Sequence, residues 1–447
     1  MRRTSLALVV TAAAVAAAPG VVHANGRFPQ SVSVTFRPGD TSDLYLGTTF
    51  GFLISHDGAS FRWLCEKNIG YEGTFDPKYR VAPDGTIYAT TFRGLRVSRD
   101  GGCSFTTATA ELPASDPGYL NNIWVDALDV AGNGDVWVAT AESARPNDVF
   151  RSTDGARTFA PTGNRSMEIW WRSLAVAPSD SQRVYVTGYQ VTQLGDDGGT
   201  IPPTVHLRRT DDAGTTWAQL PISDFQVGTS PLILIDAVSR FDPSVVFVHS
   251  VRAEAPARDK LYRSTDAGLT FAEVLTTNDA IRNVVVRSAT EVLVATQLDG
   301  LYRSTDGGAS FTAVTGSPQA ACLGDRGDAL FSCGANWDPD LFSLGRSTDA
   351  AAWTKVFRFV EMAGPLACPA GTVQHDQCEA LEWPAIREQF GIQPPPMDAG
   401  VDAPGPKPPA GGCCQASDAG PPAAIIGGVV ALWLVRRRRR KRKPCCG

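Results

Sequence analysis

A turn of the form Ser/Thr-x-Asp occurs seven times along the chain, and it constrains the fold more than any other feature. A complete copy reads Ser304-Thr-Asp-Gly-Gly-Ala-Ser-Phe311. Successive copies are 43, 54, 58, 54, 40 and 43 residues apart. A repeat of this length is usually one supersecondary unit that must stack on its neighbours to bury a core. The turns are centred on Asp57, Asp100, Asp154, Asp212, Asp266, Asp306 and Asp349.

The residues around each turn predict four short strands per repeat. A strand such as Leu174-Ala-Val-Ala177 comes first, and an alternating apolar strand such as Val136-Trp-Val-Ala-Thr140 comes second. A third strand such as Gly300-Leu-Tyr-Arg303 leads into the turn, and the fourth begins with Phe or Trp. Four strands per repeat are typical of a propeller blade. We predict an all-β, seven-bladed β-propeller over residues 27–360; the spacing leaves six or eight blades open.

The turns resemble Asp-boxes, or BNR repeats, whose pattern is Ser-x-Asp-x-Gly-x-Thr-Trp. Four copies are complete, whereas the copies at Ser55 and Ser347 are one residue short and the copy at Ser152 has Ala156 where glycine belongs. Asp-boxes occur in sialidases, sortilin-like receptors, xyloglucan-degrading enzymes and a photosystem assembly factor. The resemblance implies that each box links the third and fourth strands of a blade. It also implies that the seven aspartates are structural, since such a carboxylate accepts backbone N–H groups within a tight turn.

Three repeats are long because residues accumulate between their second and third strands, at 142–148, 190–205 and 252–260. In an up-and-down blade this loop emerges on the face opposite the repeat turns, together with the connections between blades. We therefore predict that a ligand binds there. Packing between blades is the alternative role of the tryptophans. The candidate ligand-binding residues are Tyr79, Arg80, Trp124, Asp126, Trp170, Trp171 and Arg172.

Both ends of the chain predict export. Residues 1–24 have a basic start, a short apolar core and Val22-His-Ala24 before a cleavage site, as in a signal peptide. Residues 413–447 contain Cys413 and Cys414, an apolar stretch at about 421–435 and an Arg-rich end. This arrangement resembles the C-terminal sorting signal of myxobacterial surface proteins (MYXO-CTERM). The resemblance implies processing by a sorting peptidase and display on a Gram-negative cell, and a simple membrane anchor is the alternative.

The segment between the propeller and the tail has two parts. Residues 361–392 predict a small disulfide loop followed by a short helix, and residues 393–412 predict a linker rich in proline and glycine. Ten cysteines in an exported chain favour disulfides over metal sites. The spacing suggests the pairs Cys368–Cys378, Cys322–Cys333 and Cys65–Cys103, although sequence alone leaves the connectivity open.

Charge argues against nucleic acid as a partner. Without the basic ends, residues 25–424 contain 31 basic and 46 acidic residues, a formal charge of −15. Phosphate binding requires clustered cations instead. We predict a monomeric protein that binds a protein or glycan, with no catalytic residue, metal or cofactor. The alternatives are a structural surface protein without a specific ligand and a sialidase-like glycoside hydrolase. An arginine cluster with a tyrosine, or two carboxylates across the scissile bond, would indicate the hydrolase.

Overall fold

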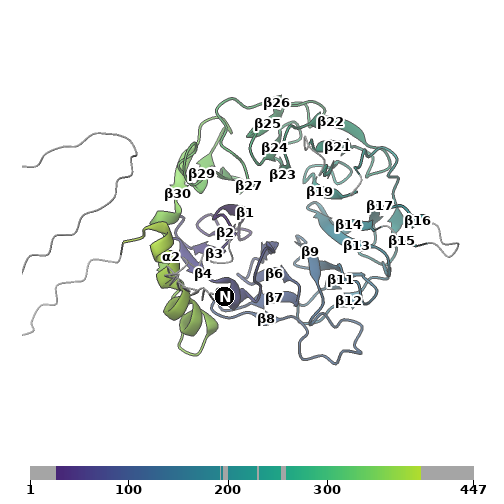
Figure 1. Cartoon of the computed structure of the whole chain (residues 1–447). Helices are drawn as coiled ribbons and strands as arrows, with labels where there is room; N and C mark the ends of the chain where they lie inside the picture. The colour runs from purple at the N-terminus through teal and green to yellow at the C-terminus, as the bar shows by residue number, and fades with distance from the viewer. Residues whose placement is uncertain (1–26, 192, 195–199, 229–230, 253–257, 394–447) are drawn as a thin grey trace, which may run out of the picture. The chain divides into compact units, whose positions relative to one another are not determined.

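Seven antiparallel four-stranded meanders, one of which gains a fifth, parallel strand at its outer edge, are arranged around a central space, which confirms the predicted seven-bladed propeller (Figure 1). The computed structural model describes residues 27–393 except 192, 195–199, 229–230 and 253–257. The predicted signal peptide and the C-terminal segment with Cys413 and Cys414 lie outside the described residues. Among those that are described, no helix is both long and apolar enough to cross a membrane.

Each blade is a meander whose first strand faces the central space. Blade 1 contains β1 (Ser31–Thr35), β2 (Leu44–Thr48), β3 (Gly51–Ser55) and β4 (Arg62–Leu64). Blade 2 contains β5 (Tyr79–Val81), β6 (Ile87–Thr91), β7 (Gly94–Ser98) and β8 (Thr106–Thr107). Blade 3 contains β9 (Val125–Val130), β10 (Val136–Thr140), β11 (Val149–Ser152) and β12 (Ala160–Pro161). Blade 4 contains β13 (Trp170–Ala177), β14 (Asp180–Gln190), β17 (Thr204–Thr210) and β18 (Ala218–Gln219).

The remaining blades follow the same order. Blade 5 contains β19 (Ile233–Val238), β20 (Val246–Ser250), β21 (Lys260–Ser264) and β22 (Ala272–Thr276). Blade 6 contains β23 (Ile281–Val286), β24 (Val292–Thr296), β25 (Leu301–Ser304) and β26 (Thr312–Ala313). Blade 7 contains β27 (Cys322–Asp325), β28 (Leu330–Cys333), β29 (Leu344–Ser347) and β30 (Thr354–Phe357). The short elements outside these sheets are α1 (Glu66–Ile69), β15 (Gln193–Leu194), β16 (Thr200–Ile201), η2 (Phe359–Glu361) and β31 (Gly364–Pro365).

The second strand of a blade is buried on both faces because neighbouring blades cover it on both sides. All five residues of β10 are buried, which explains its nearly continuous apolar sequence. The largest side chains between blades are fully buried tryptophans: Trp63, Trp137 and Trp171. The core is thus a series of layers between blades.

In each of the seven turns between third and fourth strands, the aspartate accepts the hydroxyl of the preceding Ser or Thr and at least one backbone N–H, and the Asp306 turn shows the full set of bonds. The carboxylate of Asp306 accepts the N–H groups of Ala309 and Ser310, each at 3.0 Å, and the hydroxyls of Ser304 and Ser310. Gly308 has φ +87°, and a Cβ there would come within 2.5 Å of the Phe247 ring in the preceding blade. Hydrogen bonds to the side chain and backbone of Ser310 hold the pKa of the Asp306 carboxyl below its usual range. Each turn therefore uses its aspartate to hold the chain reversal.

Replacing Asp266 with alanine is expected to lower the free energy of unfolding by about 1–2 kcal/mol, the loss typical of a capping side chain. Its carboxylate accepts two N–H and two hydroxyl groups within the blade 5 turn. Denaturant unfolding of D266A measures this loss. A matched control is Asp299→Ala, since Asp299 is an exposed aspartate in the blade 6 turn on the opposite face. Equal stability of the two variants would contradict a structural role of the turn.

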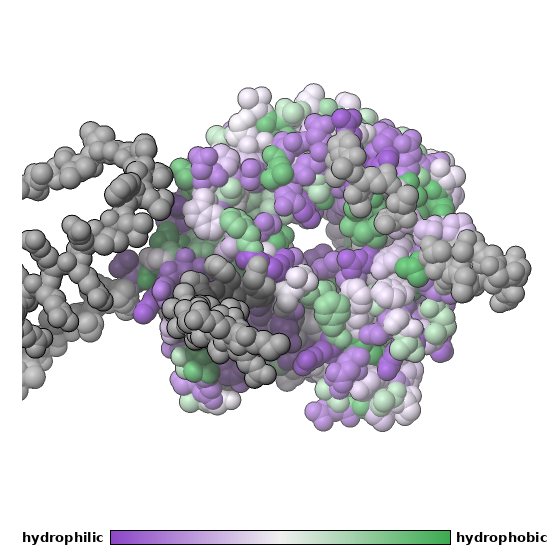
Figure 2. Space-filling view, in the orientation of Figure 1, coloured by the Kyte–Doolittle hydropathy of each residue, from purple (hydrophilic) through white to green (hydrophobic). Residues whose placement is uncertain are grey.

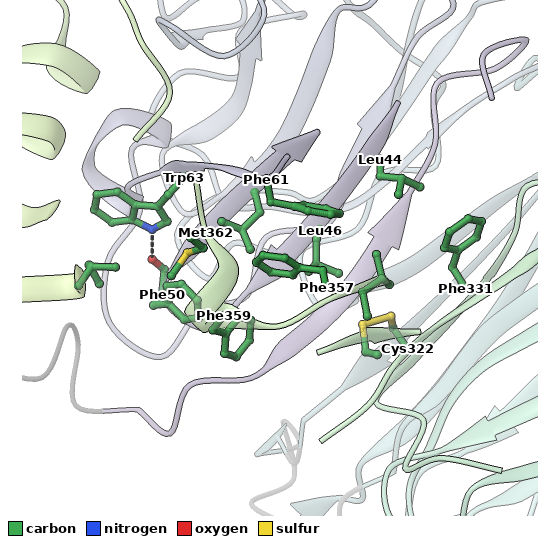
Figure 3. Close-up of a cluster of buried hydrophobic side chains, with 14 of the residues drawn as sticks. Leu44, Leu46, Phe50, Phe61, Trp63, Cys322, Phe331, Phe357, Phe359 and Met362 are labelled. Carbon is green, nitrogen blue, oxygen red and sulfur yellow. Dashed lines mark hydrogen bonds between the residues drawn. A yellow bond between two sulfur atoms is a disulfide. The ribbon is translucent and has the colours of Figure 1, made fainter. Parts of the chain in front are cut away.

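The ring closes where blade 7 meets blade 1. Figure 3 shows the buried cluster at this junction, in which Phe61 stacks on Phe357 with ring centroids 4.3 Å apart. The indole Nε1 of Trp63 donates to the carbonyl oxygen of Phe50 at 3.0 Å. The four strands of the blade 1 meander all come from the N-terminal part of the ring, and the C-terminal segment adds only the short β31 at their outer edge. Side-chain packing therefore contributes to joining the last blade to the first.

The segment after blade 7 covers the outer edge of blade 1, and we name residues 361–392 the C-terminal clasp. Its strand β31 pairs in parallel with β4, the outermost strand of that blade. A π-helix (η3, Gln374–Glu382) then continues into α2 (Trp383–Phe390), which ends at Gly391 with φ +65°. The predicted short helix is present, but helical structure begins at Gln374 and includes Cys378.

Two predicted disulfides are wrong. The structure pairs Cys65 with Cys378 and Cys103 with Cys368, so the clasp is bound to blades 1 and 2. The reason is β31, which lays the clasp along β4 and brings its two cysteines to different partners. The predicted 368–378 loop therefore does not form. The third predicted pair, Cys322–Cys333, is confirmed as a bridge between β27 and β28.

Candidate functional site

The face opposite the repeat turns carries the long loops, as the strand bounds now show. The extra residues of blades 3, 4 and 5 lie between β10 and β11, between β14 and β17, and between β20 and β21. Blade 7 adds a loop that sequence reasoning missed, residues 334–343, which contains the partly exposed Trp337. Irregular segments of different length therefore gather on one face.

Five aromatic side chains on this face form a continuous series, which we name the aromatic arc. Neighbouring ring centroids are 4.6, 4.8, 5.9 and 5.9 Å apart. The rings come from blade connections, from the β6–β7 turn and from strands of blade 4, so five separate segments build the arc. Its members, in order, are Phe75, Phe92, Trp124, Trp170 and Tyr189.

The blade 3 loop holds the two tryptophans of the arc. The carboxylate of Glu142 accepts the backbone N–H of Trp124. The side-chain amide of Asn147 donates to the carbonyl oxygen of Ile169 at 3.0 Å, next to Trp170. Asn147 is itself fully buried, so its position is fixed. The insertion that the sequence marks as unusual therefore positions neighbouring parts of the arc.

Four of the five arc residues line a groove of about 750 Å³, with Trp170 packed against the side of Trp124. The polar lining includes Lys78, Asp126 and Arg172. Arg172 pairs with the buried carboxylate of Asp126 and lies over the Trp124 ring at 5.8 Å. The ammonium of Lys78 donates to the carbonyl oxygens of Asp126 and Arg172 at 2.7 and 2.6 Å. Lys78 thus connects the inner strands of blades 2, 3 and 4.

Burial changes the proton affinity of two of these groups. Removal from water lowers the pKa of Lys78 to about 8, although Asp126 acts in the opposite direction. Burial likewise raises the pKa of the Asp126 carboxyl, against the attraction of Lys78 and Arg172. Lys78 keeps its two carbonyl partners and Asp126 keeps Arg172. These three residues form a charged, ordered floor of the groove.

A second space of about 750 Å³ lies at the centre of the ring, and we name it the central cavity. Figure 2 shows the hollow, with hydrophilic residues around it. Inner strands of several blades form its wall, and Asp76 and Lys78 line both this cavity and the groove. Deep in the wall, His249 Nδ1 lies 2.8 Å from Asp236. Although burial opposes the imidazolium, Asp236 outweighs it and raises the pKa of His249.

The structure places the seven candidate ligand-binding residues in three environments. Trp124, Asp126 and Arg172 line the groove, and Trp170 belongs to the arc. Tyr79 and Arg80 line the central cavity instead.

The prediction that Trp171 contacts a ligand is wrong. Its side chain is 0% exposed and packs between blades 3 and 4, beneath the guanidinium of Arg208. Adjacent residues of a strand point to opposite faces, so only one of the paired tryptophans can join the arc.

Sequence reasoning missed several residues of this face. No motif distinguishes Phe75, Phe92 or Arg282. Lys78 had one usable signal, since it directly precedes the candidates Tyr79 and Arg80. Tyr189 had one usable signal, since it immediately precedes the long insertion of blade 4. Their grouping follows from the ring, which brings the same end of each blade together.

The central cavity contains three arginines and a tyrosine, the residue types that a sialidase-like site would need, but their contacts differ from that role. Tyr79 stacks on Phe52 at 4.1 Å, and its hydroxyl is buried away from solvent. Arg80 forms an ion pair with Asp129, and Arg27 forms one with Asp76. The guanidinium of Arg282 donates a hydrogen bond to the amide oxygen of Gln297. Within the described part of the chain, no group of three or more His, Cys, Asp or Glu could hold a metal ion.

No family model matches the chain, and no curated protein matches it in sequence. Solved structures match it in fold. A GH74 xyloglucanase from Xanthomonas campestris is 15% identical over 72% of this chain and 60% of that chain, with a TM-score of 0.45. YCF48 from Cyanidioschyzon merolae is 13% identical over 68% of this chain and 92% of that chain, with a TM-score of 0.46. The extracellular domain of a putative hybrid two-component system from B. thetaiotaomicron is 13% identical over 68% of this chain and 38% of that chain, with a TM-score of 0.43.

The chain spans less than two thirds of the xyloglucanase. At such identities the likeness concerns fold and leaves activity open. The chain is a seven-bladed β-propeller.

Proposed function

We propose that this protein is a non-catalytic binding module that takes a protein or glycan ligand in the groove beneath the aromatic arc. The observation that carries the proposal is the arc itself, in which several segments place half-buried rings beside a charged floor. A concave site with aromatic walls and a few oriented polar groups is the usual form of a ligand site. Asp126 is engaged by Arg172 and Lys78, which suits a fixed hydrogen-bonding surface.

The proposal includes a structural role for the repeat turns and a location for the protein. We infer that the seven repeat turns are Asp-boxes, because their hydrogen bonds serve the turn and they lie on the face away from the groove. The propeller would be exported by residues 1–24 and displayed on the outer surface of a Gram-negative cell through residues 413–447. Protease treatment of intact cells should then release the propeller; complete protection of the protein would overturn the surface assignment.

A glycan array and a protein pull-down with the full-length protein test the binding function. Trp124→Ala should abolish most of the signal, because this ring lies at the middle of the arc and supports Arg172. The control is Trp337→Ala, a partly exposed tryptophan on the same face but outside the groove. Equal loss in both variants, or unchanged binding by W124A, would contradict the groove as the site.

The two alternatives predict different results. A glycoside hydrolase would release reducing ends from a polysaccharide, and the presence of Tyr79, Arg80 and Arg282 in one cavity is the observation that favours testing it. A structural surface protein would bind nothing in either assay. Loss of an assembled surface layer on deletion of the protein would support that third role.

A further inference from the structure

The wall of the central cavity is richer in positive charge than the protein around it. Four basic side chains line it, against two aspartates, Asp76 and Asp236. Residues 25–424 carry a formal charge of −15, so the cavity wall has an excess of basic side chains whereas this part of the chain has an excess of acidic ones. A concave surface of one charge sign concentrates ligands of the opposite sign. The four basic residues are Arg27, Lys78, Arg80 and Arg282.

Two of these cations make no ion pair within the described part of the chain. Lys78 donates to two neutral carbonyl oxygens, and the side chain of Arg282 donates to the neutral amide oxygen of Gln297. By contrast, Arg27 pairs with Asp76 and Arg80 with Asp129. Lys78 precedes β5 in blade 2, and Arg282 lies on β23 in blade 6, across the ring (Figure 1). Arg282 thus presents positive charge that is not paired with a carboxylate in the described part of the chain, whereas the charge of Lys78 is partly offset by the attraction of Asp126.

The central cavity and the groove are adjacent, because Asp76 and Lys78 line both. A ligand that extends from one into the other would meet aromatic rings first and cations next. The arc offers ring faces and edges interspersed with polar groups such as Thr74 and Gln190. Saccharides have the complementary surface, with apolar C–H faces and a hydroxylated rim. Each space is also large enough for a ligand of several rings.

We propose that the ligand of this face is an acidic glycan, whose sugar rings lie against the aromatic arc and whose carboxylate or sulfate groups enter the central cavity near Lys78 and Arg282. This inference rests on the proposed binding function and specifies its ligand class. Arg282 is exposed, whereas the Lys78 ammonium is buried among backbone carbonyls, so Arg282 supplies the charge that a ligand can most readily reach. Lys78 orders the inner strands and adds to the positive potential.

Titration calorimetry of the full-length protein tests the proposal with three probes: a short polyuronate, its fully methyl-esterified counterpart and a sulfated oligosaccharide. The first two share one sugar backbone, and they differ in that the charged carboxylates of the first are neutral methyl esters in the second. The polyuronate or the sulfated probe is expected to bind ~10-fold or more tightly than the ester, and whichever binds more tightly identifies the acidic group. Rising salt should reduce this difference, because the cavity is open to solvent ions.

Two variants separate charge recognition from general binding. Arg282→Gln should weaken the acidic probe by ~10-fold and leave the ester unchanged. The matched control is Arg145→Gln, since Arg145 is exposed on the blade 3 loop of the same face but outside the groove and the central cavity. Trp124→Ala should weaken both forms.

Equal affinity for the acidic and esterified probes would overturn the inference. So would an R282Q variant that binds the acidic probe as tightly as the wild type. If no glycan binds but a purified protein ligand binds in a Trp124-dependent way, the glycan inference fails while the proposed binding function stands. If neither class binds, the proposed function itself fails.

Discussion

Replacing Cys65 and Cys378 with serine is expected to lower the free energy of unfolding by about 2–5 kcal/mol, and more when Cys103 and Cys368 are replaced as well. The two bridges connect residues 313 and 265 positions apart, so each restricts a large part of the unfolded chain. They also hold the C-terminal clasp on the outer strand of blade 1. Denaturant unfolding of oxidised protein measures the effect.

The matched control for this experiment is the C322S/C333S variant. That bridge joins residues only 11 positions apart within one hairpin, so its loop-closure contribution is smaller. We expect the first clasp variant to be the less stable of the two. Because both clasp bridges secure the same segment, their effects should not be additive. Equal or greater loss in the hairpin variant would show that the clasp contributes little to ring closure.

The adjacent tryptophans of β13 are expected to affect different properties when each is replaced by alanine: stability for Trp171 and ligand binding for Trp170. Trp171→Ala should lower the free energy of unfolding by about 3–5 kcal/mol, because it leaves a large cavity between blades 3 and 4. Trp170→Ala should change stability less and weaken ligand binding, because this ring stands between Trp124 and Tyr189 in the arc. Chemical unfolding and a binding titration measure the two effects on the same proteins.

Each variant is the control for the other, since both remove an indole from neighbouring positions. A W171A protein that is as stable as the wild type would contradict its place in the core. A W170A protein that binds ligand normally would remove the outer part of the arc from the site. Gly188 supports the first expectation, because a Cβ there would come within 2.8 Å of the Trp171 ring and little space remains around it.

Much of the scaffold could be predicted because its determinants are local. The turn around Asp306 needs a carboxylate, flanking hydroxyls and glycines with positive φ, and these residues are consecutive. The alternation of apolar residues along strands such as β10 likewise reflects contacts that every blade repeats. The loops between second and third strands could be assigned to one face by the same reasoning.

The site could be predicted only in part, because its residues are neighbours through the ring alone. Trp124 and Arg172 were predicted as ligand-binding residues from their residue types and their place near the connections between blades, and the structure brings them to one groove. The structure buries Trp171 between blades and so excludes it from the ligand site. The sequence cannot show which of two consecutive tryptophans points inward. The disulfides show the same limit: Cys368 and Cys378 are close in sequence, yet β31 and η3 bring them to Cys103 and Cys65.

The sequence by itself therefore determined the class of fold and the face on which the loops are long, since turns and strands depend on short-range spacing. It also favoured seven blades, and the structure fixed that number. Only the tertiary structure decided the aromatic arc, the positive central cavity and the attachment of the clasp. These features join residues from several blades, and their contacts arise when the ring closes. The repeats specify the scaffold, while the differences among blades, once placed side by side, specify the surface to which we assign binding.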